Sequence, residues 1–269
     1  MRKRYWIFLP ALLLTLPAFW FFRLPAPPPD PVYHGKPLSK WLEQMDTGSW
    51  PRTTYCPADD AVRAISTKAL PLVNQMLRAR DSWLKSKLIA LSWKQPILRI
   101  HFIPARQLHH RALAACYVSD SLAIGALPAI SELMVSQDYD NQPFPVNLLA
   151  HLKSGAEPAI PALLQMLENT NNPVRSWASS ALWQIHRQPS LVIPALTKSL
   201  ADTNQFVRFE SARALGVFGP EAKAALPPLL ALLKDTNPTV CMEAGAAILL
   251  IDSAVAAKVG IFEDPHIIR

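Results

Sequence analysis

The sequence predicts an all-α solenoid, because three features return at a fixed interval of 33 residues. A proline, a Thr-Asn pair and a valine each occur three times in the same register. The positions are Pro161, Pro194 and Pro227 for the proline, Thr170, Thr203 and Thr236 for the pair, and Val174, Val207 and Val240 for the valine. Self-similarity of this period indicates stacked supersecondary units rather than one core that folds over itself.

Each unit is expected to contain two antiparallel helices. The helix after the proline places large apolar residues on one face, at Ile160, Leu163, Leu164 and Leu167. The helix after the valine places smaller ones at Val174, Ala178, Ala181, Leu182 and Ile185. Small side chains let neighbouring helices approach, and large ones fill the layer between units. We therefore expect an α-solenoid of helix pairs.

Four residues fall where HEAT repeats place Pro, Asp, Val and Arg: Pro194, Asp202, Val207 and Arg208. The run from 202 to 219 resembles the short bacterial E-Z type of HEAT repeat, also called phycobilisome-lyase-like. The first repeat keeps Arg175 but has Asn169 for the Asp. The third keeps Asp235 but has Cys241 for the Arg. Ankyrin repeats share the period, but their Thr-Pro-Leu-His signature is absent.

The resemblance is strong over residues 159–250 and looser over about the preceding hundred. It implies a scaffold, because HEAT arrays mostly bind other macromolecules. It does not imply lyase activity, since the repeat is a structural unit and a fold does not fix a function.

An N-terminal transmembrane helix is expected over residues 5–22, which contain 18 residues without a charge. At about 1.5 Å per residue this segment spans roughly 27 Å, close to the hydrocarbon thickness of a bilayer. Three cations at 2–4 precede it and Arg23 follows it, which predicts a cytoplasmic N-terminus and an exported body. A cleaved signal peptide is the alternative. The bulky residues 20–22 stand near the place where cleavage needs small ones, so we favour the anchor.

The chain is thus expected to have five parts. They are residues 1–24 as membrane anchor or signal peptide, 25–36 as Pro-rich linker, 37–158 as degenerate HEAT-like repeats with an insertion near 94–106, 159–252 as three regular repeats, and 253–269 as C-terminal cap and tail. In the degenerate part, Leu84 follows Pro71 by 13 residues, the spacing of Val207 after Pro194. This recurrence predicts a helix pair over 69–93.

Four charged residues of the regular repeats are expected to stabilise the stack: Arg175, Asp202, Arg208 and Asp235. An Asp in the turn can accept amide protons of the following helix while it pairs with a neighbouring Arg. Such residues form an inter-repeat polar ladder in HEAT proteins, which this resemblance implies for Asp202 with Arg208 and for Asp235 in the next unit.

The candidate partner-binding strip consists of residues on the second helices outside the apolar stripe: Trp177, Phe209, Glu210, Arg213 and Met242. Second helices usually line the concave side of HEAT arrays. Trp, Phe, Met and Arg are typical interface anchors. In the alternative interpretation, Trp177 and Phe209 fold onto the next repeat as rim packing.

A basic stretch over residues 78–111 holds eight cations against Asp81: Arg78, Arg80, Lys85, Lys87, Lys94, Arg99, Arg106 and Arg111. A solvated helix face explains it without a ligand. It can also contact anionic headgroups, an acidic partner or polymer, or nucleic acid. Export argues against nucleic acid.

Enzyme motifs are absent: the sequence has no GxGxxG, GxxxxGK[ST], HExxH or GxSxG. Ser82 and Lys85 match SxxK, but no KTG accompanies them. We expect no catalytic residue, metal, cofactor or small-molecule substrate. The function that follows is a membrane-anchored, exported scaffold that binds an unknown protein. The alternatives are a lyase-like accessory factor and, less favoured, a nucleic-acid binder.

Overall fold

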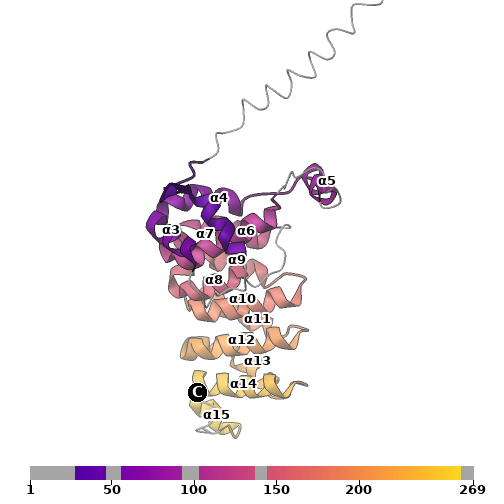
Figure 1. The fold of residues 1–269 in the computed structure, drawn as a ribbon. Coiled ribbons are helices and arrows are strands. Elements are labelled where there is room, and N and C mark those ends of the chain that lie inside the picture. Colours follow the sequence, from indigo (N-terminus) through magenta and orange to yellow (C-terminus); the bar gives the residue numbers. More distant parts are fainter. Residues whose placement is uncertain (1–27, 47–55, 93–102, 137–143, 262–269) are drawn as a thin grey trace, which may run out of the picture.

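The computed structural model describes residues 28–46, 56–92, 103–136 and 144–261, and these form a stack of helices (Figure 1). A short antiparallel hairpin of β1 (Val32–Tyr33) and β2 (Lys36–Pro37) precedes the stack. Among the helices that the structure describes, none is long and apolar enough to cross a bilayer. The segment 5–22, expected to span the membrane, lies outside the described residues.

Successive helix pairs make up the body, and each first helix packs against its second helix. The first helices are α4 (Leu70–Leu77), α7 (Asp120–Val135), α9 (Ile160–Met166), α11 (Pro189–Ser199) and α13 (Leu226–Leu232). The second helices are α6 (Ala105–Val118), α8 (Phe144–Leu152), α10 (Asn172–Ile185), α12 (Gln205–Phe218) and α14 (Pro238–Ile251). Neighbouring second helices pack side by side, so α12 lies between α10 and α14 (Figure 1). The expected solenoid is therefore confirmed for the described body.

Shorter helices and 3-10 turns form the two ends of the stack and connect the helix pairs. They are α2 (Leu38–Leu42), η1 (Glu43–Asp46), α3 (Pro57–Ile65), η2 (Ser66–Ala69), η3 (Lys153–Ala159), η4 (Gly219–Ala225) and α15 (Ser253–Lys258). The 3-10 turns η2, η3 and η4 each lead into a first helix whose first turn holds a proline. Proline suits that position because its missing N–H has no helical partner there.

Pro194 departs from this pattern, because it lies inside α11 rather than at its beginning. The helix starts five residues earlier, at Pro189, in the place that a 3-10 turn occupies in the neighbouring units. The repeated proline therefore lies at the beginning of a helix in the first and last regular repeats, and inside a helix in the middle repeat.

Small residues bring the second helices close together. Ser179 of α10 and Ser211 of α12 are both fully buried, and their hydroxyl oxygens lie 3.2 Å apart. In the next step of the stack Gly216 of α12 faces Ala247 of α14, and a Cβ on the glycine would lie 3.0 Å from the alanine Cα. Close packing at these positions fixes the spacing of the units.

The structure differs from the helix pair expected over 69–93. Helix α5 (Trp83–Ser92) stands apart from the body in Figure 1, and α6 packs against α4 instead. Leu84 is 59% exposed, whereas Val207 at the corresponding spacing is fully buried. Four and five residues after Val207, α12 has the small residues Ser211 and Ala212, whereas the corresponding positions of α5 after Leu84 hold the larger Leu88 and Ile89.

Candidate interaction surface and cavity

The polar ladder links each repeat to the next through an Arg and an Asp 27 residues apart. Arg175 donates from Nε and Nη2 to the two carboxylate oxygens of Asp202, both at 2.7 Å. Arg208 does the same to Asp235, at 2.7 and 2.8 Å. Asp202 therefore pairs with the arginine of the preceding repeat, and Arg208 donates to the backbone carbonyl of Asp202 at 2.9 Å.

Each aspartate of the ladder also stabilises the turn that follows it. Asp202 accepts from the backbone N–H of Asn204 at 2.8 Å, and Asp235 accepts from Asn237 at 2.8 Å. Burial alone would raise the pKa of Asp202, but hydrogen bonds from Arg175 and Asn204 and the arginine charges outweigh it and lower the pKa. The hydrogen bonds of Arg208 are the main cause of the lowered pKa of Asp235.

The ladder changes chemistry in the last regular repeat, where Cys241 replaces the arginine. Its thiol donates to the backbone carbonyl of Asp235 at 3.2 Å. Arg208 makes the equivalent bond to Asp202 one repeat earlier. The cysteine thus keeps the hydrogen bond within its own repeat, but it has no guanidinium group that could pair with an aspartate of a following repeat.

The strip residues lie on α10, α12 and α14 and differ in exposure. Met242 is 65% exposed and Arg213 is also exposed, whereas Phe209 is half-buried. Trp177 is partly buried and packs against the core. The side chains that remain available for contact are therefore mainly those of α12 and α14.

A mixed-charge cluster lies on the same helices. The guanidinium carbon of Arg213 lies 5.0 Å from the centroid of the Trp183 ring, within the range of a cation–π contact. Burial raises the pKa of both Glu210 and Glu243, and the charge of Arg213 opposes this shift without cancelling it. Glu243 shares the 33-residue column of Trp177 and Glu210 but is not among the predicted strip residues, and Trp183 belongs to no such column.

Glu210 is the most constrained member of this cluster. Its burial and the nearby charge of Glu243 raise its pKa. The charge of Arg213 and hydrogen bonds with Ser180 and Trp183 oppose this shift, but the pKa remains raised. Its Oε2 atom and the indole nitrogen of Trp183 are both buried, and in the described parts of the chain neither makes a hydrogen bond of regular geometry. Burial likewise raises the pKa of Glu243. Two carboxylates therefore remain on this surface in a setting that opposes their ionisation.

The residues of the basic stretch do not form one continuous face. Lys85 pairs with Asp81 at 2.6 Å, and Lys87 lies over the ring of Trp83. Arg106 lines a small cavity of about 270 Å³ beside His110. Lys94 and Arg99 lie outside the described residues.

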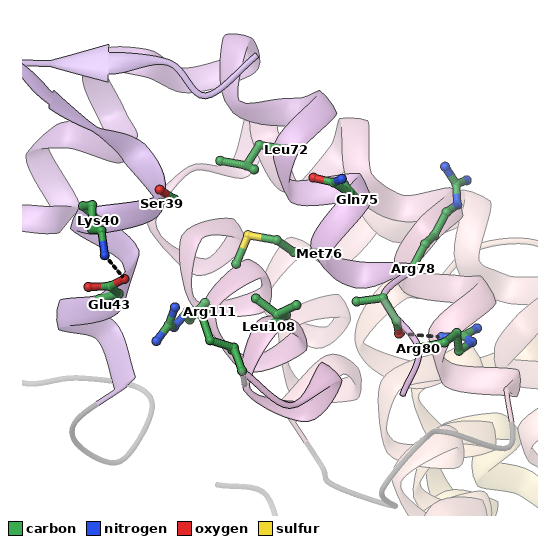
Figure 2. Close-up of a pocket in the computed structure, with 12 residues that line it drawn as sticks. Ser39, Lys40, Glu43, Leu72, Gln75, Met76, Arg78, Arg80, Leu108 and Arg111 are labelled. Carbon is green, nitrogen blue, oxygen red and sulfur yellow. Dashed lines mark hydrogen bonds and ion pairs between the residues drawn. The ribbon is translucent and has the colours of Figure 1, made fainter. Parts of the chain in front are cut away.

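The other three arginines of the stretch line one larger cavity of about 800 Å³ (Figure 2). The cavity lies between α2 with η1, the second half of α4, and α6. Its lining comprises Ser39, Lys40, Glu43, Leu72, Gln75, Met76, Arg78, Ala79, Arg80, Ile103, Leu108 and Arg111. No sequence signal pointed to it, because its walls come from separate segments that share no motif.

In the described ranges no group of His, Cys, Asp or Glu side chains could hold a metal ion. Cys116 is fully buried, and burial raises the pKa of its thiol to about 12. A thiol in this setting stays protonated and unreactive at neutral pH.

A match to a family model supports the architecture of the second half of the chain. Residues 127–216 and 160–250 match the model of the HEAT-repeat family. Crystal structures of three engineered proteins are similar at 22%, 21% and 21% identity, with TM-scores of 0.46, 0.45 and 0.48. The matches cover 84%, 80% and 80% of this chain and 60%, 96% and 98% of the engineered chains. No protein of curated function matches the chain.

Proposed function

Because residues 127–250 of the chain are HEAT repeats, we propose that the protein is a non-catalytic scaffold that binds another protein. The binding surface is the face of α10, α12 and α14 that carries Phe209, Arg213 and Met242. Stacked repeats suit this role because they present an extended surface along the stack.

The observation that supports this proposal best is the state of Glu210. A half-buried carboxylate with a raised pKa opposes folding, because burial disfavours its charged form. Groups of this kind are often retained for binding or chemistry. Beside it, Met242 and Phe209 would provide apolar contact to the partner.

Site-specific photo-crosslinking tests the proposal. A photoreactive amino acid at Met242 should yield an adduct with one partner protein in the native host. The same amino acid at Ala231, which is exposed on α13, should not. Phe209→Ala should abolish the adduct from position 242, whereas Leu191→Ala should preserve it, because Leu191 is 54% exposed on α11.

Circular dichroism of each variant separates loss of binding from loss of structure. Adducts that form equally from both positions would contradict the proposed surface. A large loss of helicity in Phe209→Ala would mean that this side chain belongs to the core.

We also propose that residues 5–22 anchor the protein in a membrane and that the helical body is exported. The support is in the sequence: an uncharged segment with three cations before it and one after it. Protease added to intact cells should then degrade the body. The mass of the mature N-terminus should show the segment retained. A protected body would contradict export, and a mature chain that begins after residue 22 would show a cleaved signal peptide.

A further inference from the structure

Helix α5 exposes three large apolar side chains that are close in sequence: Trp83 is 74% exposed, Leu84 59% and Leu88 37%. The helix stands apart from the body in Figure 1, and no described element packs against it as α6 packs against α4. Contact of these side chains with water costs free energy, which burial against a partner would recover. A cluster of this kind on an otherwise polar surface marks an interaction site.

The apolar and charged residues of α5 are arranged around one stripe. Leu84 and Leu88 lie one helical turn apart, on the same face. At about 100° per residue, Lys87 and Lys85 lie about 60° to either side of this stripe. Ile89 lies outside it, so the helix is apolar over much of its circumference. Helices of this composition are normally buried in protein or lipid.

The charges on α5 are positive. Lys85 pairs with Asp81 at 2.6 Å, so the net charge of this segment comes from Lys87. The side chain of Lys87 is exposed, and its Nζ lies 5.3 Å from the centroid of the Trp83 ring. Between Asp81 and Asp120 the sequence has no acidic residue. The charge of the helix therefore favours an anionic occupant.

Local hydrogen bonds begin the helix without help from the body. The backbone N–H of Lys85 donates to Ser82 Oγ at 3.2 Å, and that of Ser86 donates to the carbonyl of Ser82 at 2.9 Å. A helix as short as α5 is only marginally stable in water without tertiary packing. A surface that covers its leucine stripe would therefore also stabilise the helix.

An anionic bilayer matches both the stripe and the charge. Leucine side chains enter the acyl region, tryptophan prefers the headgroup layer, and lysine extends its ammonium group toward the phosphates. A nucleic acid would match Lys87 but would leave Leu84 and Leu88 in water.

The proposed anchor would bring a membrane within reach of α5, and this part of the support rests on that proposal. Residue 28 can lie at most roughly 20 Å from residue 22. Figure 1 shows α5 at the end of the stack that contains α3 and α4, whereas α15 lies at the other end.

We propose that α5 lies in the surface of a bilayer that contains anionic lipids, with Leu84 and Leu88 toward the acyl chains. Trp83 and Lys87 lie at the level of the headgroups. This contact is separate from the face of α10, α12 and α14 that is proposed to bind a protein.

Fluorescence of the full-length chain, reconstituted in vesicles of phosphatidylcholine and phosphatidylglycerol in equal parts, tests the proposal. An environment-sensitive fluorescent amino acid replaces Leu88 in one variant and Ala90, on the opposite side of α5, in another. The probe at position 88 should emit at shorter wavelength and should be quenched by phospholipids brominated near the glycerol. The probe at position 90 should show neither change. In phosphatidylcholine alone, the ratio of bound to free α5 should be about fivefold lower, the contribution of one lysine near an anionic surface.

Two variants with matched controls, each with the probe at position 88, separate the apolar and charged contributions. Leu84→Gln should lower the ratio of bound to free α5 about tenfold or more, because burial of one leucine is lost. Leu191→Gln, at a position 54% exposed on α11, should leave the ratio unchanged. Lys87→Glu should lower it at least about fivefold. Lys258→Glu makes the same change of charge at an exposed position of α15 and should have no effect. Circular dichroism shows whether each variant is folded.

Flotation reports the proposed anchor separately. A chain held by residues 5–22 stays with phosphatidylcholine vesicles in high salt, whereas the contact of Lys87 weakens with salt. A chain that floats while the probe at position 88 is neither shifted nor quenched overturns this inference and leaves the anchor in place. A chain that does not float while the probe responds to added anionic vesicles overturns the anchor alone.

Three further outcomes would overturn the proposal. Equal responses of the probes at positions 88 and 90 would mean that the leucine stripe does not face the bilayer. An equal ratio of bound to free α5 in neutral vesicles would mean that the cations do not contribute. A shift to shorter wavelength that appears without vesicles and grows with protein concentration would mean that a second copy of the chain covers α5.

Discussion

Arg208 donates two hydrogen bonds to the carboxylate of Asp235, a residue that lies 27 positions later and in the next helix pair. A third bond, from Nη1, reaches the backbone carbonyl of Asp202 within its own repeat. One side chain thus joins two units of the stack. Arg175 repeats the arrangement one step earlier, so the links form a series.

Arg208→Ala should lower the free energy of unfolding by about 3–5 kcal/mol, because it leaves Asp235 nearly buried without its cation. Lys198→Ala is the matched control. It removes an ion pair of similar length to Glu168, but both partners are exposed, so we expect a loss of only about 0–1 kcal/mol. Urea unfolding followed by circular dichroism measures both. Equal losses in the two variants would mean that the ladder does not stabilise the stack.

Acid should weaken the ladder at a pH below that at which exposed carboxylates begin to protonate. The folded-state pKa values of Asp202 and Asp235 lie below the ordinary value of 3.8. Their contribution is therefore complete above pH 3.8 and disappears as the pH falls through the folded-state pKa values. Melting temperatures from pH 5 to pH 2 should fall more steeply for the natural chain than for Asp202→Asn with Asp235→Asn. Parallel curves would refute this linkage.

Glu210→Gln should stabilise the protein at pH 7. The folded-state pKa of Glu210 lies above 4.5, so the carboxyl favours folding while it is protonated, and this advantage is lost as the pH rises through that pKa. We expect a gain on the order of 0.5 kcal/mol at pH 7, small because solvent partly screens the group.

The pH dependence of the melting temperature checks this explanation. The gain from Glu210→Gln should shrink near pH 4, where the natural carboxyl is also protonated. Glu221→Gln, at an exposed position in η4, should change stability at neither pH. The opposite sign at pH 7 would mean that ionised Glu210 stabilises the fold.

Gly216→Ala should destabilise the protein by about 1–3 kcal/mol through overpacking. The added methyl group would lie 3.0 Å from the Cα and 3.2 Å from the Cβ of Ala247, which cannot move without shifting α14. Gly245→Ala is the control, because its nearest neighbour is Ile261 Cδ1 at 3.6 Å. Alanine should favour the helix there by up to about 1 kcal/mol. Thermal unfolding of both variants should show opposite signs.

The sequence was most informative where the same residue has the same neighbours in every unit. Val174, Val207 and Val240 are all fully buried, as their spacing predicts. The periodicity was misleading at Leu84, because a matching spacing does not report whether the rest of the helix has small residues for close packing. It also did not predict that Asp202 pairs with Arg175 of the preceding unit.

The candidate surfaces were predictable only in part. A 33-residue column marks Glu210 and Glu243, but their raised pKa values depend on burial, which the column does not show. The cavity beside Arg80 and Arg111 could not be predicted. It depends on how α2, α4 and α6 meet, and these helices carry no shared pattern.

The base of α5 has a practical consequence for handling the protein. Asp81 accepts from the backbone N–H of Ala105 at 2.9 Å, and a ring nitrogen of His109 lies 3.0 Å from the carbonyl oxygen of Ala79. The segments that precede and follow α5 are therefore hydrogen-bonded to each other where they leave the body. A fluorescent domain spliced into α5, or its replacement by a short tether, should leave the remaining architecture assembled.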